Sequence, residues 1–156
     1  IAPWLLIARL TLPRTPHRKQ SMAIQIQRKS GTQLAQGVHI RNHQFSTDVS
    51  AAEGGADDGP SPHDLYDAAL GACKALTVMW FAKKKGIAVD DIHTEVTSDN
   101  SQERAGVYKL TTKLVISGTI NDAEFAQLVA AAEKCPVHKL MTSVTTEITT
   151  TVERAG

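Results

Sequence analysis

Apolar and polar positions alternate with period two in several segments of the chain, and this pattern predicts β-strands. The alternating segments are residues 23–27, 38–45, 92–97, 108–116 and 144–152. The polar residues 98–106 join the third segment to the fourth, which predicts a hairpin. In the last segment the apolar side chains stand among threonines, so we expect a strand there too.

A long helix is predicted over residues 62–85. Ser61 suits the N-cap, Pro62 suits the first helical position, and Asp64 stands where a capping box places its acid. Three lysines fill the last turn, and Gly86 can take the left-handed conformation that ends a helix. The middle of this helix is apolar almost all round, so we expect it to be buried on most sides.

A second helix is predicted over residues 121–134, with Glu124 at its capping-box position. Pro136 disfavours a helical conformation in the residue before it, so the helix should break at Cys135. Pro136 can then open a short helical turn through Leu140. Strand pairs separated by two helices predict an α+β fold instead of a doubly wound sheet. One protomer has few elements to cover the long helix, so we expect a homodimer with this helix at the interface.

Composition and charge narrow the class of protein. The chain has 156 residues, of which 42% are hydrophobic and 21% charged, as in an ordinary globular domain. The net charge is +1, but residues 1–21 hold four basic residues and no acid, so the remainder is negative. A negative body with 4% aromatic residues gives no electrostatic footprint for nucleic acid. No apolar run approaches the roughly 20 residues of a membrane span. We therefore expect neither nucleic acid nor a membrane as a partner.

Residues 1–21 are interpreted as an N-terminal extension, either translated upstream sequence or an extended start. They hold three prolines, and the regular pattern starts only after Met22. The apolar residues 4–8 precede Arg9, whereas a secretory signal has its charge first; a transit peptide is a weaker alternative. We therefore expect a single domain over residues 22–156 and a cytoplasmic location.

Two cysteines are too few for a disulfide framework, and three interpretations stay open for them: buried fillers, a metal site or a redox pair. Cys73 stands among apolar residues of the long helix, which should raise the pKa of its thiol. Cys135 stands at a helix break, where a new helix N-terminus and Lys134 would stabilise a thiolate. From these surroundings alone, Cys135 is expected to be the more acidic thiol. His138 follows on the same turn, either as an exposed polar residue or as part of the site.

Two ordered motifs resemble the OsmC/Ohr family of thiol peroxidases. The first is the glycine-rich stretch 53–61 followed by Pro62-His63-Asp64-Leu65 and Leu70-Gly71-Ala72-Cys73. The second is Cys135-Pro136-Val137 and the short turn after it. The resemblance covers about residues 22–154. The residues of the first motif are closer to the OsmC-like branch than to the organic hydroperoxide resistance branch.

The resemblance implies an intertwined homodimer with two long central helices and antiparallel sheets wrapped around them. It implies that Cys73 is the peroxidatic cysteine and that Cys135 is the resolving one. The substrate would be an organic hydroperoxide, and a dithiol of lipoyl type, or another thiol, would be the reductant. No cofactor is implied. The chemistry needs a thiolate that becomes a sulfenic acid and a second thiol that condenses with it, so their Cα atoms must approach within about 7 Å.

The sequence departs from the family pattern at the position after the first proline. Family members carry a glutamate there that helps to hold an arginine near the thiolate, whereas this chain has His63. Arg41, on the predicted strand before the loop, is the best candidate for the arginine, with Arg28 behind it. For each of them an ordinary strand residue is the favoured interpretation, and a role beside the thiolate is the alternative. We retain both His63 and Arg41 as candidate site residues.

Two other functions compete with the peroxidase. The first is a non-enzymatic protein of the same fold that binds a lipid-like ligand in the apolar space between its helices, which the missing glutamate favours. The second is a metal site built from Cys73, Cys135, His138 and His63, although only the Cys-x-x-His spacing resembles a motif.

Overall fold

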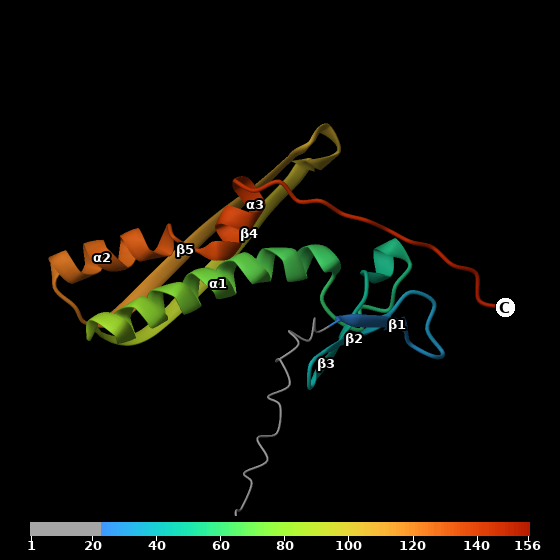
Figure 1. The fold of residues 1–156 in the computed structure, drawn as a ribbon, viewed down its shortest axis with the longest axis horizontal. Coiled ribbons are helices and arrows are strands. Elements are labelled where there is room, and N and C mark those ends of the chain that lie inside the picture. Colours follow the sequence, from blue (N-terminus) through green and yellow to red (C-terminus); the bar gives the residue numbers. More distant parts are fainter. Residues whose placement is uncertain (1–22) are drawn as a thin grey trace, which may run out of the picture.

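The computed structural model describes residues 23–156, and the expected extension over residues 1–21 lies outside the described residues. Figure 1 shows a small sheet beside a larger body made of a long hairpin and helices. The small sheet has the strand order β1-β2-β3, and all its pairs are antiparallel. Its strands are β1 (Gln25–Arg28), β2 (Gln36–Ile40) and β3 (His43–Thr47). The described residues form antiparallel sheets and three α-helices, so the chain is an α+β protein, as the sequence predicts.

The strand predicted over residues 38–45 is instead a hairpin, so that prediction is wrong. β2 and β3 pair with Val38 opposite Phe45 and Ile40 opposite His43. Arg41 takes the left-handed conformation in the turn between them, with φ 59°. Only a few per cent of residues other than glycine adopt this conformation, and the pair Arg41-Asn42 lacks the glycine that usually marks such a turn.

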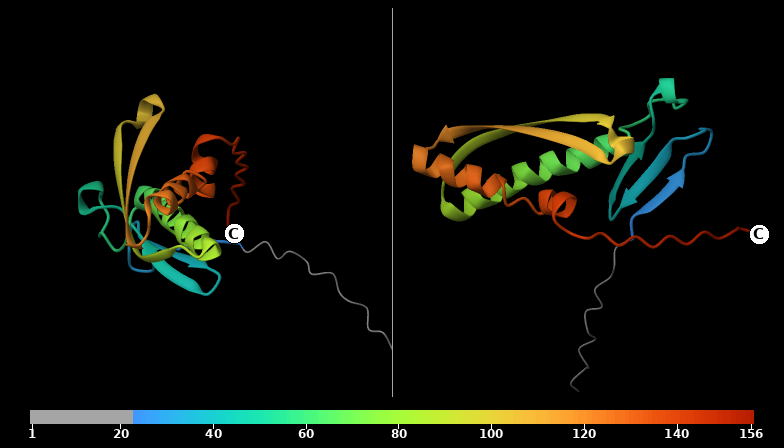
Figure 2. Two further views of the ribbon diagram at one scale, coloured as in Figure 1. Left: turned by 90° about the vertical axis from the view of Figure 1, so that its left-hand side faces the viewer. Right: turned by 90° about the horizontal axis from the view of Figure 1, so that it is seen from above.

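The larger body is built on the hairpin of β4 (Ala88–Gln102) and β5 (Val107–Thr119), joined by a short 3-10 turn. Helix α1 (Pro62–Lys85) packs against β4, and α2 (Asp122–Ala132) and α3 (Pro136–Thr142) pack against α1. Figure 2 shows the helices together on one side of the hairpin. None of the helices within residues 23–156 combines the length and the hydropathy that a membrane crossing needs.

Both ends of α1 follow the predicted chemistry. The Ser61 hydroxyl accepts a hydrogen bond from the backbone N–H of Asp64, and the Asp64 carboxylate accepts one from the backbone N–H of Ser61. Gly86 closes the helix with φ 69°. In the middle, a Cβ atom on Gly71 would lie 2.6 Å from a methyl group of Val96. The glycine therefore lets α1 approach β4 closely.

The core lies along the C-terminal half of α1. Val78 and Ala82 are buried there against Ile87 and against Leu128 of α2. The opposite face of α1 is open, since Leu76 is 70% exposed and Trp80 is 65% exposed. The expectation of a helix buried on most sides is therefore not met within one protomer.

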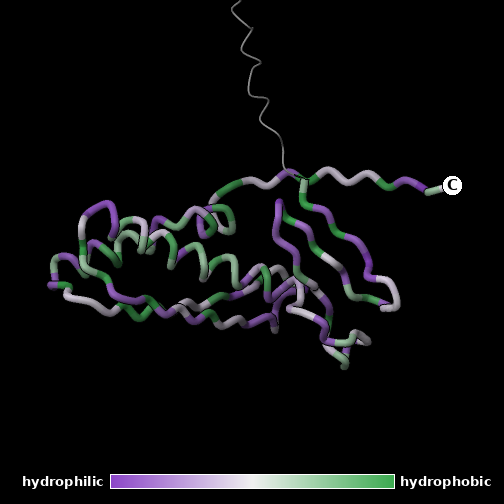
Figure 3. Tube along the Cα trace, turned by 90° about the horizontal axis from the view of Figure 1, so that it is seen from below, coloured by the Kyte–Doolittle hydropathy of each residue, from purple (hydrophilic) through white to green (hydrophobic). Residues whose placement is uncertain are grey.

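The last predicted strand, residues 144–152, does not form. Residues 145–156 have no regular secondary structure and run away from the body (Figure 1). Ile148 is 83% exposed and Val152 is 90% exposed. Figure 3 shows apolar and polar positions following one another along this segment. A strand exists only beside a hydrogen-bonding neighbour, and within residues 23–156 the segment is paired with no other strand.

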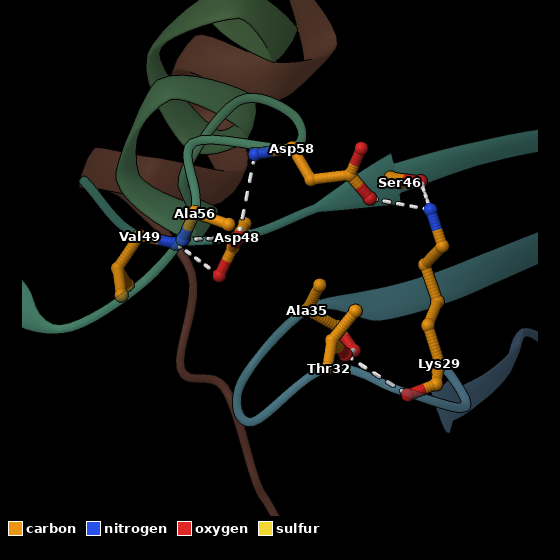
Figure 4. Close-up of polar contacts among 8 residues, drawn as sticks. All are labelled: Lys29, Thr32, Ala35, Ser46, Asp48, Val49, Ala56 and Asp58. Carbon is orange, nitrogen blue, oxygen red and sulfur yellow. Dashed lines mark hydrogen bonds and ion pairs between the residues drawn. The ribbon is translucent and has the colours of Figure 1, made fainter. Parts of the chain in front are cut away.

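The Asp48 carboxylate organises the loop that leads into α1 (Figure 4). It accepts hydrogen bonds from the backbone N–H groups of Val49 and Ala56, both at 2.9 Å, and of Asp58 at 3.3 Å. Lys29 pairs with Asp58 and donates to the Ser46 hydroxyl at 3.0 Å. The loop therefore folds around one buried carboxylate.

The same loop is tied to the sheet and to the start of α1. The Thr47 hydroxyl donates to the carbonyl oxygen of Pro60 at 2.7 Å, which fixes the end of β3 beside the helix cap. A Cβ atom on Gly55 would lie 2.0 Å from the carbonyl oxygen of Val49, so only glycine fits there. These contacts set where α1 begins, and hence where its cysteine lies.

Replacing Asp48 by alanine should destabilise the protein, because three N–H groups lose their acceptor. We expect a lower urea midpoint at pH 7 for Asp48→Ala, and no change for Asp90→Ala, which alters an exposed carboxylate of β4.

The stabilisation provided by the Asp48 carboxylate should also decrease at low pH. The N–H groups of Ala56 and Val49, which outweigh the opposing effect of burial, hold the pKa of Asp48 below its usual range. The stabilisation is therefore complete above the carboxyl's unfolded pKa, about 3.9, and is lost as the pH falls through the lower folded pKa. Equal midpoints for wild type and Asp48→Ala at pH 7 would contradict this account.

Candidate active site

The fold brings the two cysteines together although 61 residues separate them in the sequence. Cys73 lies on α1 and is partly exposed, and Cys135 is the buried N-cap residue of α3. The two thiols are free and lie within hydrogen-bonding reach of each other. α1 supplies one of them, and the joint between α2 and α3 supplies the other.

The pKa of the Cys73 thiol is lowered from its ordinary value. Burial is the largest single effect and opposes ionisation, but several smaller effects together outweigh it, led by hydrogen bonds from the Val137 backbone and the Cys135 thiol. The Thr77 hydroxyl and the charge of Lys74 act in the same direction. Because the Thr77 hydroxyl also lies 2.7 Å from the carbonyl oxygen of Cys73, its single hydrogen can turn to either acceptor.

The pKa of the Cys135 thiol is raised. Burial is the largest cause, and the neighbouring Cys73 adds to it, against the N–H groups of His138 and Val137. The expectation that Cys135 is the more acidic thiol is therefore wrong. The short helix α3 does present amide groups at its start, but the Val137 N–H also serves the sulfur of Cys73 across the helix contact.

An apolar cavity of about 570 Å³ opens beside Cys73. Its walls come from α1 and from the α2–α3 joint, and they consist of Leu76, Thr77, Trp80, Phe81, Ala131, Lys134 and Pro136. A molecule held there would meet the Cys73 sulfur, whereas Cys135 lies buried behind it. The cavity is therefore suited to an apolar compound that reacts with Cys73.

Sequence reasoning missed Lys74 as part of this site. Its side chain is buried, and its ammonium group donates to the carbonyl oxygen of Ala132 at 3.0 Å. The same group lies 3.4 Å from Nδ1 of His138, which places that histidine in the site instead of in solvent. The signal was present in the sequence, because Lys74 is the one charged residue in the apolar stretch 68–81.

His63 does not lie beside the cysteines. It stands ten residues before Cys73 on α1, or about 15 Å along the helix axis. Its Nε2 lies 2.9 Å from a carboxylate oxygen of Glu103, at the tip of the β4–β5 hairpin. This carboxylate raises the pKa of His63, against the smaller effect of burial. Within the protomer, His63 thus joins the start of α1 to the hairpin.

The candidate arginines also lie away from Cys73. Arg41 occupies the exposed turn between β2 and β3. Arg28, at the end of β1, donates to the carbonyl oxygen of Thr32 in the neighbouring turn. The charge beside the Cys73 sulfur in this protomer comes from Lys74 instead.

The residues of the metal hypothesis do not converge, because His63 is remote from Cys73, Cys135 and His138. Within residues 23–156, no three His, Cys, Asp or Glu side chains are grouped so that they could hold a metal ion. The structure instead brings together two thiols, with hydrogen-bond donors directed at the sulfur of Cys73.

Solved structures share this fold at low sequence identity. A putative osmotic stress induced and detoxification response protein from Psychrobacter arcticus has 19% identity and a TM-score of 0.64, over 81% of this chain and 93% of that one. An OsmC-like protein from Mycoplasma pneumoniae has 18% identity and a TM-score of 0.63, over 81% and 91%. An organic hydroperoxide resistance protein OsmC from Legionella pneumophila has 22% identity and a TM-score of 0.54, over 80% and 93%.

The sequence itself carries the family assignment. No curated protein matches the chain. The sequence model of the OsmC-like proteins, however, matches residues 55–151, more than half of the chain and both cysteine motifs. The resemblance seen in those motifs is thereby confirmed, and the chain belongs to the OsmC family.

Proposed function

We propose that this protein is a thiol peroxidase that reduces organic hydroperoxides, with Cys73 as the peroxidatic cysteine and Cys135 as the resolving one. One observation carries the proposal: Cys73 has a lowered pKa, opens onto an apolar cavity, and has a second thiol within hydrogen-bonding reach. A low pKa and access to substrate are what distinguish a reactive cysteine from a structural one. The order of the roles follows, since Cys135 is buried and its pKa is raised.

The first step is attack of the Cys73 thiolate on the O–O bond of the hydroperoxide. The new S–O bond gives a Cys73 sulfenic acid, and the departing alkoxide takes a proton to become an alcohol. The Cys135 thiol then attacks the Cys73 sulfur, which forms a disulfide and releases water. The raised pKa of Cys135 keeps it protonated until Cys73 has been oxidised.

A dithiol reductant would complete the cycle by exchange. Its thiolate attacks the Cys73–Cys135 disulfide, and its second thiol resolves the mixed disulfide, so both protein thiols are restored and the reductant leaves oxidised. We place this cycle in the cytoplasm, where thiol systems keep such pairs reduced. There it would serve in defence against oxidative stress.

The cavity supports an organic substrate over hydrogen peroxide. Leu76, Trp80 and Phe81 give it an apolar wall, which favours an alkyl or fatty-acyl hydroperoxide over a small polar one. The Legionella protein of the same fold, which is named for organic hydroperoxide resistance, agrees with this choice.

The same cavity favours one alternative, a protein that binds an apolar ligand without turning it over. A volume of about 570 Å³ lies in the usual range for small-molecule sites. Consumption of hydroperoxide in the presence of a dithiol separates the two functions, because a binding protein would leave the hydroperoxide intact.

We also propose that the protein acts as a homodimer. Three apolar surfaces are exposed among residues 23–156 of one protomer: the Trp80 face of α1, the Ile26 face of the small sheet, and the C-terminal segment with Ile148 and Val152. A second copy supplies matching surfaces, and a strand of one chain can pair with a sheet of the other. The cavity beside Cys73 would then be roofed by the partner.

Exchange of each cysteine for serine should give different results. Cys73→Ser should reduce hydroperoxide consumption to the uncatalysed rate, because it removes the nucleophile. Cys135→Ser should consume about one equivalent and leave a Cys73 sulfenic acid, which excess hydroperoxide then over-oxidises. A sulfenate-selective reagent followed by mass spectrometry identifies the modified residue. Activity retained in Cys73→Ser, with the label on Cys135, would show that the two roles are reversed.

Charges placed on the C-terminal segment should weaken the dimer. Burial of an Ile or Val side chain contributes roughly 1.5–3 kcal/mol, so Ile148→Asp with Val152→Asp should raise the dimer dissociation constant at least about a hundredfold. Thr149→Asp with Thr151→Asp, at the alternate positions of the same segment, is the control and should stay dimeric. Sedimentation at micromolar concentration measures both. A wild-type protein that sediments as a stable monomer would refute the homodimer.

A further inference from the structure

Lys74 is an unusual residue for a buried position between packed helices. It is 4% exposed, and lysine is almost never fully buried unless it is paired. An apolar residue in its place would need no partners, and replacing buried charged groups by well-packed hydrophobic ones is often neutral or stabilising. Lys74 therefore calls for an explanation other than stability alone.

The contacts of Lys74 lie on both sides of Cys135. Its ammonium group donates to the carbonyl oxygen of Ala132 at 3.0 Å and lies 3.8 Å from the carboxylate of Glu133, both before the cysteine. It also lies 3.4 Å from Nδ1 of His138, three residues after the cysteine. An ammonium group has three donor hydrogens and no acceptor, so Nδ1 of His138 is the acceptor and its proton is on Nε2.

These contacts join the segment that carries Cys135 to the residue that follows Cys73. The segment is the joint between α2 and α3, residues 133–135, where Pro136 has no N–H to continue the hydrogen bonding of α2. The N–H of Lys134 bonds to the carbonyl oxygen of Ala131, and the N–H of Lys139 bonds to that of Cys135. These backbone bonds lie within the joint, so its attachment to α1 depends on packing and on side-chain contacts such as those of Lys74. The Glu133 side chain is 70% exposed, so the carbonyl oxygen and the imidazole are the stronger partners.

We propose that Lys74 is a positioning residue that holds the α2–α3 joint against α1 and thereby keeps the Cys135 thiol within bonding reach of Cys73. The inference rests on the proposed function only in taking the two cysteines as the partners of one disulfide. It assigns Lys74 a role in the second step, the condensation of the Cys73 sulfenic acid with Cys135. The same contacts keep the Val137 N–H directed at the Cys73 sulfur, since Val137 precedes His138.

The effective concentration of one thiol relative to the other measures this positioning directly. The purified protein is equilibrated with reduced and oxidised glutathione, and the fraction with the Cys73–Cys135 disulfide is found by acid quenching, alkylation and mass spectrometry. Each disulfide formed reduces one oxidised glutathione to two thiols, so the equilibrium constant has units of concentration. A merely structural residue would change the unfolding midpoint and leave this constant unchanged.

Lys74→Met removes the three donors and keeps a side chain of similar length. We expect its effective concentration to fall at least about tenfold relative to wild type, because the joint is no longer held. Lys83→Met is the matched control: it removes the same charge from an exposed position of the same helix, and its constant should stay within about twofold of wild type.

A second variant approaches the same contacts from α3. His138→Ala removes one acceptor from a partly exposed position and should lower the effective concentration in the same direction, by less than Lys74→Met. It also serves if Lys74→Met does not fold, which circular dichroism and the thermal midpoint report. Folded Lys74→Met and His138→Ala proteins with the wild-type constant would overturn the proposal.

The outcome for Lys74 is separable from that for the peroxidase. A wild-type protein that forms the disulfide with glutathione but does not consume organic hydroperoxide would overturn the proposed function and leave the comparison of the variants intact. A folded wild-type protein that forms no Cys73–Cys135 disulfide in any glutathione buffer would overturn the role of Lys74 together with the pairing of the cysteines.

Discussion

The site depends on one constraint, the break in the helix at Pro136. The proline removes a backbone N–H and disfavours the helical conformation at Cys135, so α2 ends at Ala132 and α3 begins at Pro136. This places a buried thiol and the exposed amide groups of a new helix against the middle of α1. The Val137 N–H then reaches the sulfur of Cys73, and the pKa of that thiol falls in spite of its burial. Without the break there would be neither a second thiol in reach nor a donor.

The second requirement is that α1 is held in register with this joint from both ends. At its start, the carboxylate of Asp48 and the contact between Thr47 and Pro60 fix the loop that leads into the Ser61 cap. In its C-terminal half, Val78 and Ala82 pack against Leu128. Lys74 adds a polar contact between these two regions, at the level of the cysteines. The site is thus built where two packed helices meet, and its geometry follows from theirs.

Features governed by local chemistry could be predicted from the sequence. The Ser61 cap, the Gly86 stop and the break at Cys135 depend on a few neighbouring residues, and the structure has all three. Alternation and the polar connection between the two segments predict the β4–β5 hairpin, although β4 extends through the polar segment as far as Gln102. The α+β class and the family followed from the order of elements and from the two motifs.

Features governed by distant contacts could not be predicted. The acidity of the two thiols was assigned in the wrong order, because a donor that is next to Cys135 in the sequence also serves Cys73 in space. The turn at Arg41 was missed because it uses a non-glycine residue in the left-handed conformation. The final strand needs a neighbour, and residues 144–152 pair with no strand of the described part of the chain. Lys74 was visible as a charge in an apolar stretch, but only its contacts across 58 and 64 residues give it a role.

Differential alkylation of the reduced wild-type protein tests the central claim most directly, the claim that the fold makes Cys73 the more acidic and accessible thiol. A limiting amount of iodoacetamide is added at a series of pH values between 5 and 9, and mass spectrometry gives the fraction of each cysteine that is modified. The account predicts that Cys73 is alkylated first throughout, with a rate that rises through a pKa below the ordinary thiol value of about 8.5, while Cys135 stays protected. Equal alkylation of both residues, or modification of Cys135 first, would contradict it.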